Sequence, residues 1–302
     1  MTRSLLFAAL AFFLMTAPAF AGFEIEQVTT HDADSSGPSV ASSPDGGSMV
    51  GYHADGGIIL MSFAMVQQVP TSPATDELWP PPVTLNSGGA PEICWTREGF
   101  VAAFASGPMI LVYQSDLFGN WDLQNYELMD PGGVVQSIDL WGVASDAAGP
   151  YAFMTLQVTS DPPSDEYKVL YSSKGAIGGW TPFEMVTEQT LQRPWPQMTF
   201  GLGPAGPWPR IFYLSPAFGG GLDLVYTTKD LAAGWTVPTV VPGDGGTAPT
   251  PLGGSFDVVT SYGLNMNVLG LGPQPTCPCG SIHYLAHDFN GGWAPQENMT
   301  VI

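Results

Sequence analysis

The hydrophobic positions of this chain fall into short apolar runs, and one phrase built on such a run recurs four times. In each copy an aromatic-bearing apolar run is followed by a short polar turn, and a tryptophan stands eight or nine residues after a tyrosine. The copies are Tyr113 to Trp121, Tyr171 to Trp180, Tyr226 to Trp235 and Tyr284 to Trp293, and a degenerate fifth copy runs from Ile58 to Trp79. The tryptophans are separated by 42 to 59 residues, a period typical of radial or stacked β repeats. The pattern therefore predicts five repeat units.

Each unit divides into four short expected strands, which we call A to D. In the unit that begins at Pro91, strand A is expected over 92–96, strand B over 100–105 and strand C over 109–114, and Trp121 opens strand D. Glycine occurs in every turn between strands A and B, where a positive φ angle costs little. No long helical periodicity follows the first 21 residues. The units are therefore predicted to be entirely β.

Four-stranded units at this spacing favour an all-β fold, a five-bladed β-propeller with four-stranded antiparallel blades, since radial repetition leaves only short, protected strand edges. A β-sandwich is the alternative, but it would not require one landmark to recur five times. The expected blades span 38–89, 91–134, 136–190, 193–246 and 248–302, within a single domain over 22–302. Residues 22–30 are expected to form an outer strand. Whether this segment or residues 297–302 closes the ring stays open.

The first 21 residues have the pattern of a cleaved signal peptide. Arg3 supplies the positive charge, residues 5–15 the apolar segment, and Ala19 and Ala21 a small-x-small cleavage site. We therefore expect a mature protein that begins at Gly22 and is secreted or periplasmic. No later apolar run approaches the roughly 18 residues that a spanning helix needs, so membrane insertion is not expected.

The chain is strongly acidic and carries few charges overall. Without Arg3 it has 6 basic and 27 acidic residues, a net charge of −21, and only 11% of all residues are charged. Such a field repels nucleic acid and anionic lipid, so nucleic-acid partners are excluded. The polar, Gly- and Pro-rich remainder suits tight turns between many short strands.

The turn between strands C and D carries its own motif, with these members: Ser115, Asp116, Gly119 and Trp121 in the second unit, Asp230 and Trp235 in the fourth, and Asp288 and Trp293 in the fifth. These turns resemble the Asp-box, Ser-x-Asp-x-Gly-x-x-Trp, of sialidase-like (BNR repeat) propellers, although the spacing differs slightly and Gly175 replaces Asp in the third unit. In that family the boxes lie on the face opposite the ligand site, so the resemblance implies a structural role. The Asp can accept turn amides, the Gly permits left-handed backbone, and the Trp can bury its ring between blades while its indole N–H finds a partner.

The catalytic residues of sialidases cannot be carried over to this chain. Those enzymes clamp the substrate carboxylate with three arginines, whereas the mature chain has only Arg97, Arg193 and Arg210. Arg97 and Arg210 are expected near the face that carries the Asp-boxes, and Arg193 is expected on the opposite face. The three arginines therefore cannot converge on one ligand.

Any ligand is expected on the face formed by the D–A and B–C loops, because binding usually resides in long loops on a rigid scaffold. Glu92, Asp139 and Asp257 lie near the ends of inner strands, towards the axis, and Arg193 and Trp195 lie at the rim. Carboxylates at a narrow mouth repel one another unless they are protonated or bridged by a cation. A Ca²⁺ ion or a polyhydroxylated ligand is thus one interpretation, and solvated side chains that cap turns are the other.

The cysteines and histidines give weaker signals. Cys277 and Cys279, expected in the B–C loop of the last unit, are close enough in sequence for a local disulfide, although so short a ring would be strained. Cys94 lies in an inner strand and is interpreted as a small buried apolar residue. The histidines form no metal signature, so no metal site is assigned to them.

Three functions remain open at this point. We expect an exported, non-catalytic propeller that binds a glycan or a protein partner. The alternatives are a glycoside hydrolase that draws a carboxylate pair from Glu92, Asp139 and Asp257, and a purely structural or assembly module.

Overall fold

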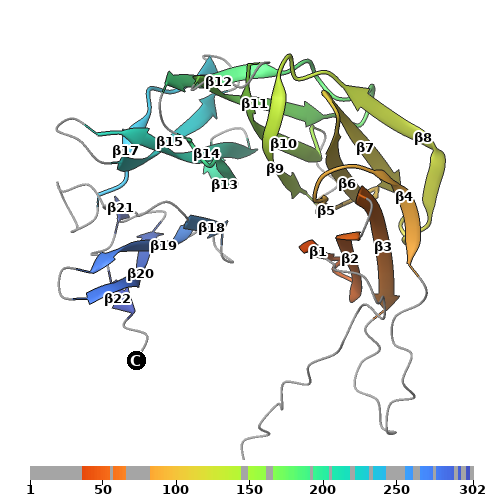
Figure 1. Cartoon of the computed structure of the whole chain (residues 1–302), viewed down its shortest axis with the longest axis horizontal. Coiled ribbons are helices and arrows are strands. Elements are labelled where there is room, and N and C mark those ends of the chain that lie inside the picture. The colour runs from red at the N-terminus through yellow and green to blue at the C-terminus, as the bar shows by residue number, and fades with distance from the viewer. Residues whose placement is uncertain are drawn as a thin grey trace, which may run out of the picture. The chain divides into compact units, whose positions relative to one another are not determined.

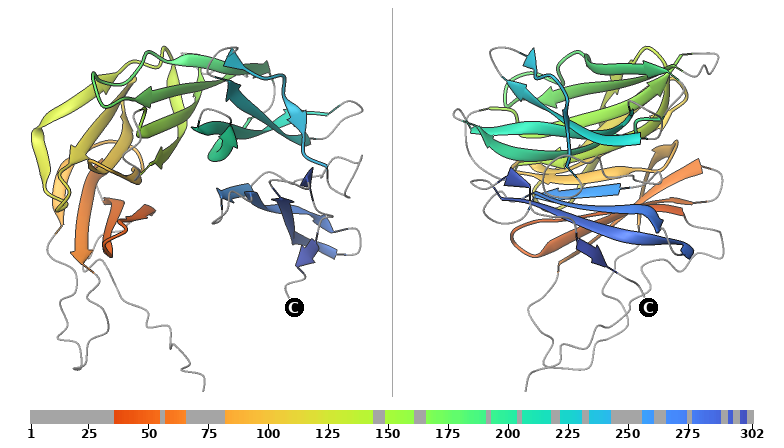
Figure 2. Two further views of the ribbon diagram at one scale, coloured as in Figure 1. Left: turned by 180° about the vertical axis from the view of Figure 1, so that it is seen from behind. Right: turned by 90° about the vertical axis from the view of Figure 1, so that its left-hand side faces the viewer.

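A computed structural model describes most of the chain beyond residue 35. The described residues are 36–54, 57–65, 82–143, 149–160, 166–190, 193–203, 206–217, 222–230, 234–242, 256–260, 266–274, 277–288, 292–293 and 297–299. The expected signal peptide (1–21), the expected outer strand (22–30) and Trp79 lie outside them. Figure 1 and both views in Figure 2 draw the described chain as arrows joined by loops. None of the elements described is a helix long and apolar enough to cross a membrane.

The described strands form five antiparallel sheets that follow one another along the chain (Figure 1). The first sheet contains β1 (Ser36–Ser42), β2 (Gly47–Ala54), β3 (Ile58–Met65) and β4 (Val83–Ser87). The second contains β5 (Glu92–Thr96), β6 (Gly99–Ser106), β7 (Met109–Ser115) and β8 (Trp121–Met129). The third contains β9 (Val134–Gly142), β10 (Ala152–Thr159), β11 (Glu166–Lys174) and β12 (Glu184–Thr190).

The last two sheets have the same order, but their outer strand is divided into two short pieces that pair with the third strand. The fourth contains β13 (Gln197–Gly203), β14 (Gly206–Pro216), β15 (Leu222–Asp230), β16 (Gly234–Trp235) and β17 (Thr239–Val240). The fifth contains β18 (Phe256–Thr260), β19 (Met266–Gln274), β20 (Cys277–Asp288), β21 (Gly292–Trp293) and β22 (Glu297–Met299). Four successive antiparallel strands per unit are therefore confirmed.

The repeated tryptophan occupies one register position in the second to fifth sheets. Each described copy pairs with a residue near the end of the third strand of its own sheet, as follows: Trp121 with Ser115, Trp180 with Lys174, Trp235 with Lys229, and Trp293 with His287. The spacing in the sequence thus identified equivalent places in the described sheets.

Successive sheets pack against each other through separate apolar clusters. One cluster joins Met49 and Ile59 of the first sheet to Phe100 and Tyr113 of the second, and Trp121 packs against it. Corresponding clusters join the second to the third, the third to the fourth and the fourth to the fifth sheet, with Trp180, Trp235 and Trp293 packed against them. Each fully buried aliphatic or aromatic side chain contributes about 1.5–3 kcal/mol. The repeated tryptophan therefore helps to hold its sheet against the preceding one.

The first strand of each sheet lies beside the first strand of the next. Contacts join β1 to β5, β5 to β9, β9 to β13 and β13 to β18. The approach of β5 and β9 is so close that a Cβ atom at Gly142 would stand 1.8 Å from the carbonyl oxygen of Trp95. Within the described residues no sheet closes on itself, and closure of the five sheets into a ring stays a prediction.

Two expectations from the sequence are wrong in detail. Cys277 and Cys279 belong to β20 and not to a loop, because the β19–β20 pairing extends to Gln274 and Cys277; their expected disulfide falls outside what the structure describes. The indole N–H groups of Trp180, Trp235 and Trp293 are buried without a hydrogen-bond partner among the described residues. These rings are held by packing, and Trp235, for example, contacts Tyr171 edge to face at 5.2 Å between ring centroids.

Candidate functional site

The segment before β13 presents one exposed aromatic ring between two buried prolines. Pro194 and Pro196 are buried, whereas Trp195 is 40% exposed. Trp195 also has a φ angle of 48° and is the only non-glycine residue with positive φ in the part of the chain that the structure describes. Left-handed backbone costs roughly 1–2 kcal/mol in a non-glycine residue, and such strain persists only where the surroundings enforce it.

The surroundings of Trp195 hold its backbone from three sides. Its N–H donates to Oε1 of Gln157 at 3.0 Å, and Gln157 is itself buried in β10. The carbonyl oxygen of Pro194 accepts the N–H of Leu214 at 2.7 Å. Three residues further on, the N–H of Met198 donates to the Asp139 carboxylate. The backbone is therefore fixed, and the ring is presented to solvent in a defined position.

Arg193 lies against the same ring. Its guanidinium carbon is 5.4 Å from the centroid of Trp195, and one guanidinium nitrogen donates to Oε1 of Gln136 at 3.1 Å. A cation over an indole face is attracted by the ring quadrupole. The expected rim pair, Arg193 and Trp195, is thus brought together.

The expected axial carboxylates lie on the first strands of three different sheets: Glu92 on β5, Asp139 on β9 and Asp257 on β18. Oε2 of Glu92 accepts the hydroxyl of Ser39 on β1 at 3.1 Å, and this hydroxyl accepts the N–H of Ile93 at 3.0 Å. The Asp139 carboxylate accepts the N–H of Met198 on β13. The Glu92 and Asp139 side chains therefore each link one first strand to that of a neighbouring sheet.

These carboxyl groups interact electrostatically. Burial raises the pKa of Asp139 to about 8, the N–H of Met198 opposes this rise, and the charges of Glu92 and Asp257 add to it. Burial also raises the pKa of Glu92, although the hydrogen bond from Ser39 lowers it. Asp139 therefore holds a proton at neutral pH, which is one of the two ways to relieve repulsion in such a group.

A bridging cation would be the other way to relieve the repulsion between these carboxyl groups, but the described residues do not offer a set of ligands for one. No group of three His, Cys, Asp or Glu side chains suitable for a metal ion occurs among the residues described. Asp257 is exposed, and its Oδ1 accepts the N–H of Val258 at 2.8 Å. The expectation of Ca²⁺ stays untested.

The arginines lie against three different aromatic rings. The guanidinium carbon of Arg97 is 5.2 Å from the ring centroid of Tyr151, and that of Arg210 is 6.0 Å from the ring centroid of Tyr226. Both are separate from the Arg193–Trp195 pair. Among the described residues, the arginines thus do not form a triad around one ligand position.

The second-unit turn behaves as its sequence predicts. Oδ1 of Asp116 accepts the N–H of Phe118 at 2.8 Å and that of Asn120 at 2.9 Å, and Gly119 has a φ angle of 80°. The Ser115 hydroxyl accepts the N–H of Phe100 at 2.9 Å. Slight burial raises the pKa of Asp116, but the hydrogen bonds from Asn120 and Phe118 outweigh it, and the pKa falls below its ordinary value.

The equivalent acidic residues of the later units stand at strand ends. Asp230 is the last residue of β15 and pairs with Gly234, and Asp288 is the last residue of β20 and pairs with Gly292. Asp230 and Asp288 thus occupy equivalent positions, each immediately before its turn. Asp116, by contrast, lies beyond the end of β7, inside its turn.

Sequence reasoning missed the residues that support the site. Ser39, Gln136 and Gln157 each hold a candidate side chain or its backbone. Gln157 alone had a usable signal, because it is the one large polar side chain in β10, whose other residues are apolar or threonine, and buried polar side chains need a partner.

Comparisons with known proteins give structural similarity without sequence similarity. No protein-family model matches the sequence, and no curated protein matches it. Similar solved structures include an exo-β-1,3-galactanase from Phanerochaete chrysosporium in complex with β-1,3-galactotriose, which is 12% identical with a TM-score of 0.45. The alignment covers 93% of this chain and 64% of the galactanase chain.

Two further similar structures have the same level of identity. The SapL1 lectin in complex with α-methyl fucoside is 12% identical with a TM-score of 0.49, over 87% of this chain and 79% of the lectin. The α-L-arabinanase of Penicillium chrysogenum in complex with arabinobiose is 12% identical with a TM-score of 0.49, over 87% of this chain and 80% of the enzyme. All three TM-scores are below 0.5.

Proposed function

We propose that the protein is an exported, non-catalytic β-propeller that binds a glycan, with Trp195 as the stacking platform. The observation that carries the proposal is the exposed Trp195 ring, held by a strained and fully anchored backbone. The proposal includes the single domain of five blades expected over 22–302. Clusters between successive sheets and contacts between successive first strands support that architecture.

The chemistry of the segment suits a sugar. An indole presents a flat apolar face, which can pack on the C–H face of a pyranose, and its rigidity reduces the entropy that binding would otherwise cost. Arg193 stands beside the ring with donor groups that can reach ligand hydroxyls. A protein ligand could use the same platform, and binding to a glycan array distinguishes the two.

One observation favours hydrolysis as the second candidate. A protonated Asp139 beside Glu92 and Asp257 has the acid and base forms that a glycoside hydrolase uses. Against it, Asp139 and Glu92 each engage an oxygen in a hydrogen bond to a neighbouring first strand. These bonds give the two carboxyl groups a structural role, so binding without chemistry is the better-supported function.

A glycan array probed with labelled protein, followed by calorimetry on the glycan that binds most tightly, tests the proposal. Trp195→Ala should weaken that glycan about tenfold, the equivalent of about 1.4 kcal/mol of lost stacking. Phe118→Ala is the matched control, because Phe118 is also an exposed aromatic, at 78%, but lies in the second-unit turn. The control should bind like the wild type.

Three outcomes would count against this function. Binding to no glycan on the array would remove it, and equal loss in both variants would remove Trp195 from the site. Release of reducing sugar from the bound glycan, lost in Asp139→Asn, would establish the hydrolase instead.

A further inference from the structure

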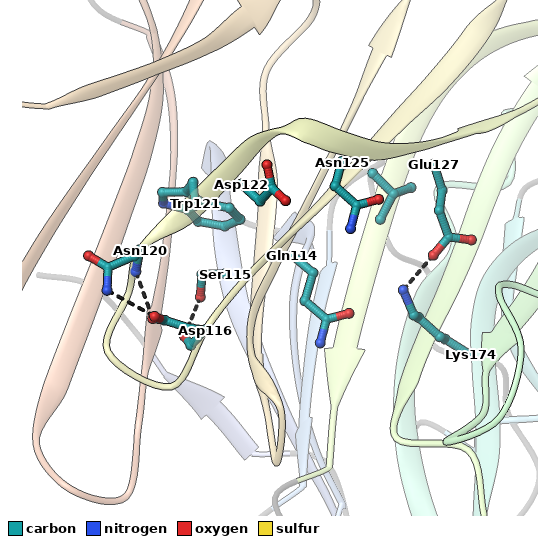
Figure 3. A pocket seen from close by; sticks show the side chains of 10 residues that line it. Gln114, Ser115, Asp116, Asn120, Trp121, Asp122, Asn125, Glu127 and Lys174 are labelled. Atoms are coloured by element: carbon teal, nitrogen blue, oxygen red, sulfur yellow. Dashed lines mark hydrogen bonds and ion pairs between the residues drawn. The ribbon is translucent and has the colours of Figure 1, made fainter.

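A groove of about 460 Å³, lined mainly by polar residues, lies on the second sheet beside its outer strand (Figure 3). Its lining includes Gln114, Asp116, Trp121, Asn125, Glu127 and Lys174. Figure 3 shows the Asp116 turn and Trp121 at one end, the Glu127–Lys174 pair at the other, and Gln114 and Asn125 between them. The groove shares no residue with the Trp195 segment.

The groove arises from an irregular pairing of β7 with β8. The pairs Ser115–Trp121 and Tyr113–Tyr126 enclose a single residue of β7, Gln114, and four residues of β8. The extra residues force the outer strand to arch away from its neighbour. Bulges of this kind redirect side chains and are frequent beside functional sites.

The third and fourth sheets pair differently at the same place. There, two residues of the third strand stand opposite three of the outer strand. The hydroxyl of Ser172 donates to the carbonyl oxygen of Thr181 at 2.7 Å, and Thr227 does the same to Thr236 at 2.7 Å. The hydroxyls of Thr181 and Thr236 also each accept a backbone N–H from the third strand at 3.0 Å. The gap is thus closed by hydrogen bonds that the second sheet does not make.

The charged groups around the groove are already satisfied within the protein. Glu127 pairs with Lys174 and also accepts the N–H of Trp180 at 3.2 Å. Asp116 accepts three hydrogen bonds from its own turn, and Oδ1 of Asp122 accepts the N–H of Gln124 at 3.1 Å. A charged ligand would have to compete with these contacts.

The side-chain amides of Gln114 and Asn125, by contrast, can still form hydrogen bonds with a ligand. Asn125 is exposed and lines the groove, and the side-chain bonds of Gln114 to Glu98 and Tyr151 are long, at 3.5 Å each. Each amide offers both donors and acceptors, the complement of a sugar hydroxyl. The volume falls in the range of about 300–1,000 Å³ typical of small-ligand sites.

We propose that this groove is a second binding site, for a neutral saccharide of one or two residues that hydrogen-bonds Gln114 and Asn125 and packs against Trp121. Binding in the groove does not depend on the Trp195 site. With both sites the protein would be bivalent for glycans. Two linked sites raise the apparent affinity for a surface that carries many copies of a sugar.

Saturation-transfer NMR tests the proposal directly. The probes are glucose, galactose, mannose, N-acetylglucosamine and lactose as neutral sugars, with glucuronic acid and glucosamine as charged counterparts. At least one neutral sugar should bind to the Trp195→Ala variant, in which the other proposed site is removed. Asn125→Ala and Gln114→Ala in that background should each weaken it roughly fivefold to tenfold. Gln124→Ala, an amide on the same strand that does not line the groove, should leave it unchanged.

Three results would overturn the groove as a neutral-saccharide site. The first is the absence of binding by any neutral probe, and the second is tighter binding by a charged counterpart. The third is an equal effect of the Gln124→Ala control. Thermal melts of all variants exclude unfolding as the cause, and the two amide variants provide independent readings if one is unstable.

Discussion

Replacement of Asp139 by asparagine should make the protein more stable at neutral pH and remove much of its pH dependence. The folded pKa is about 8, against 3.8 ordinarily. Below pH 3.8 the carboxyl is protonated in both states and contributes no penalty. Between these values the unfolded chain ionises while the folded protein keeps its proton, so stability falls as pH rises, and it levels off above pH 8.

The stability penalty that Asp139 causes follows from the difference between its folded and unfolded pKa values. Each pH unit corresponds to about 1.4 kcal/mol, so the penalty at pH 7 is at most about 4 kcal/mol. Asparagine keeps an oxygen that accepts the N–H of Met198, as the protonated carboxyl does, but its amide has two N–H donors to satisfy where the acid has one O–H. A net gain of about 2–4 kcal/mol at pH 7, and almost none at pH 4, is therefore expected for Asp139→Asn.

Urea unfolding followed by tryptophan fluorescence, at constant ionic strength from pH 4 to pH 9, measures both curves. Asp130→Asn is the matched control, because Asp130 is exposed and its Oδ1 accepts the N–H of Gly132, a bond that asparagine can keep. The control should follow the wild type. A wild-type stability that rises from pH 4 to pH 8, or an Asp139→Asn curve parallel to it, would refute the reasoning.

Four further outcomes are expected. Asp116→Ala should lower the free energy of unfolding by about 1 kcal/mol, since its carboxylate is exposed, and leave glycan affinity at the Trp195 site unchanged; unchanged stability with lost binding at the Trp195 site would reverse the structural assignment of Asp116. Trp195→Gly should have a free energy of unfolding about 1 kcal/mol higher than that of Trp195→Ala in urea, because only glycine relieves the strain at a φ of 48°. A more stable alanine variant would show that the backbone is unstrained. Gly142→Ala should fail to fold or lose more than about 3 kcal/mol, whereas Gly175→Ala, whose nearest neighbour would be 3.8 Å away, should be tolerated. N-terminal sequencing of the protein exported from a bacterial host should begin at Gly22, and a retained Met1 would contradict the signal peptide.

Local features could be predicted from the sequence because their causes lie within a few residues. Strand β5 was expected over 92–96 and occupies those residues, since apolar alternation and turn glycines act over short distances. The Asp116 turn is likewise closed by atoms within four residues of the carboxylate. The tryptophan spacing identified equivalent register positions because the turn length fixes which residue the tryptophan must oppose.

Chemistry at the candidate sites was decided by contacts between distant segments. The N–H of Trp195 meets Gln157 across 38 positions of sequence, and the N–H of Met198 meets Asp139 across 59; neither pair has a local signature. The groove carried a faint signal, an interval of eight residues and not nine from Tyr113 to Trp121, but its lining from Lys174 required the third sheet to pack on the second. Strands follow from local pattern, whereas a raised pKa, a strained backbone or a groove depends on which strands become neighbours, and only the tertiary structure determines that.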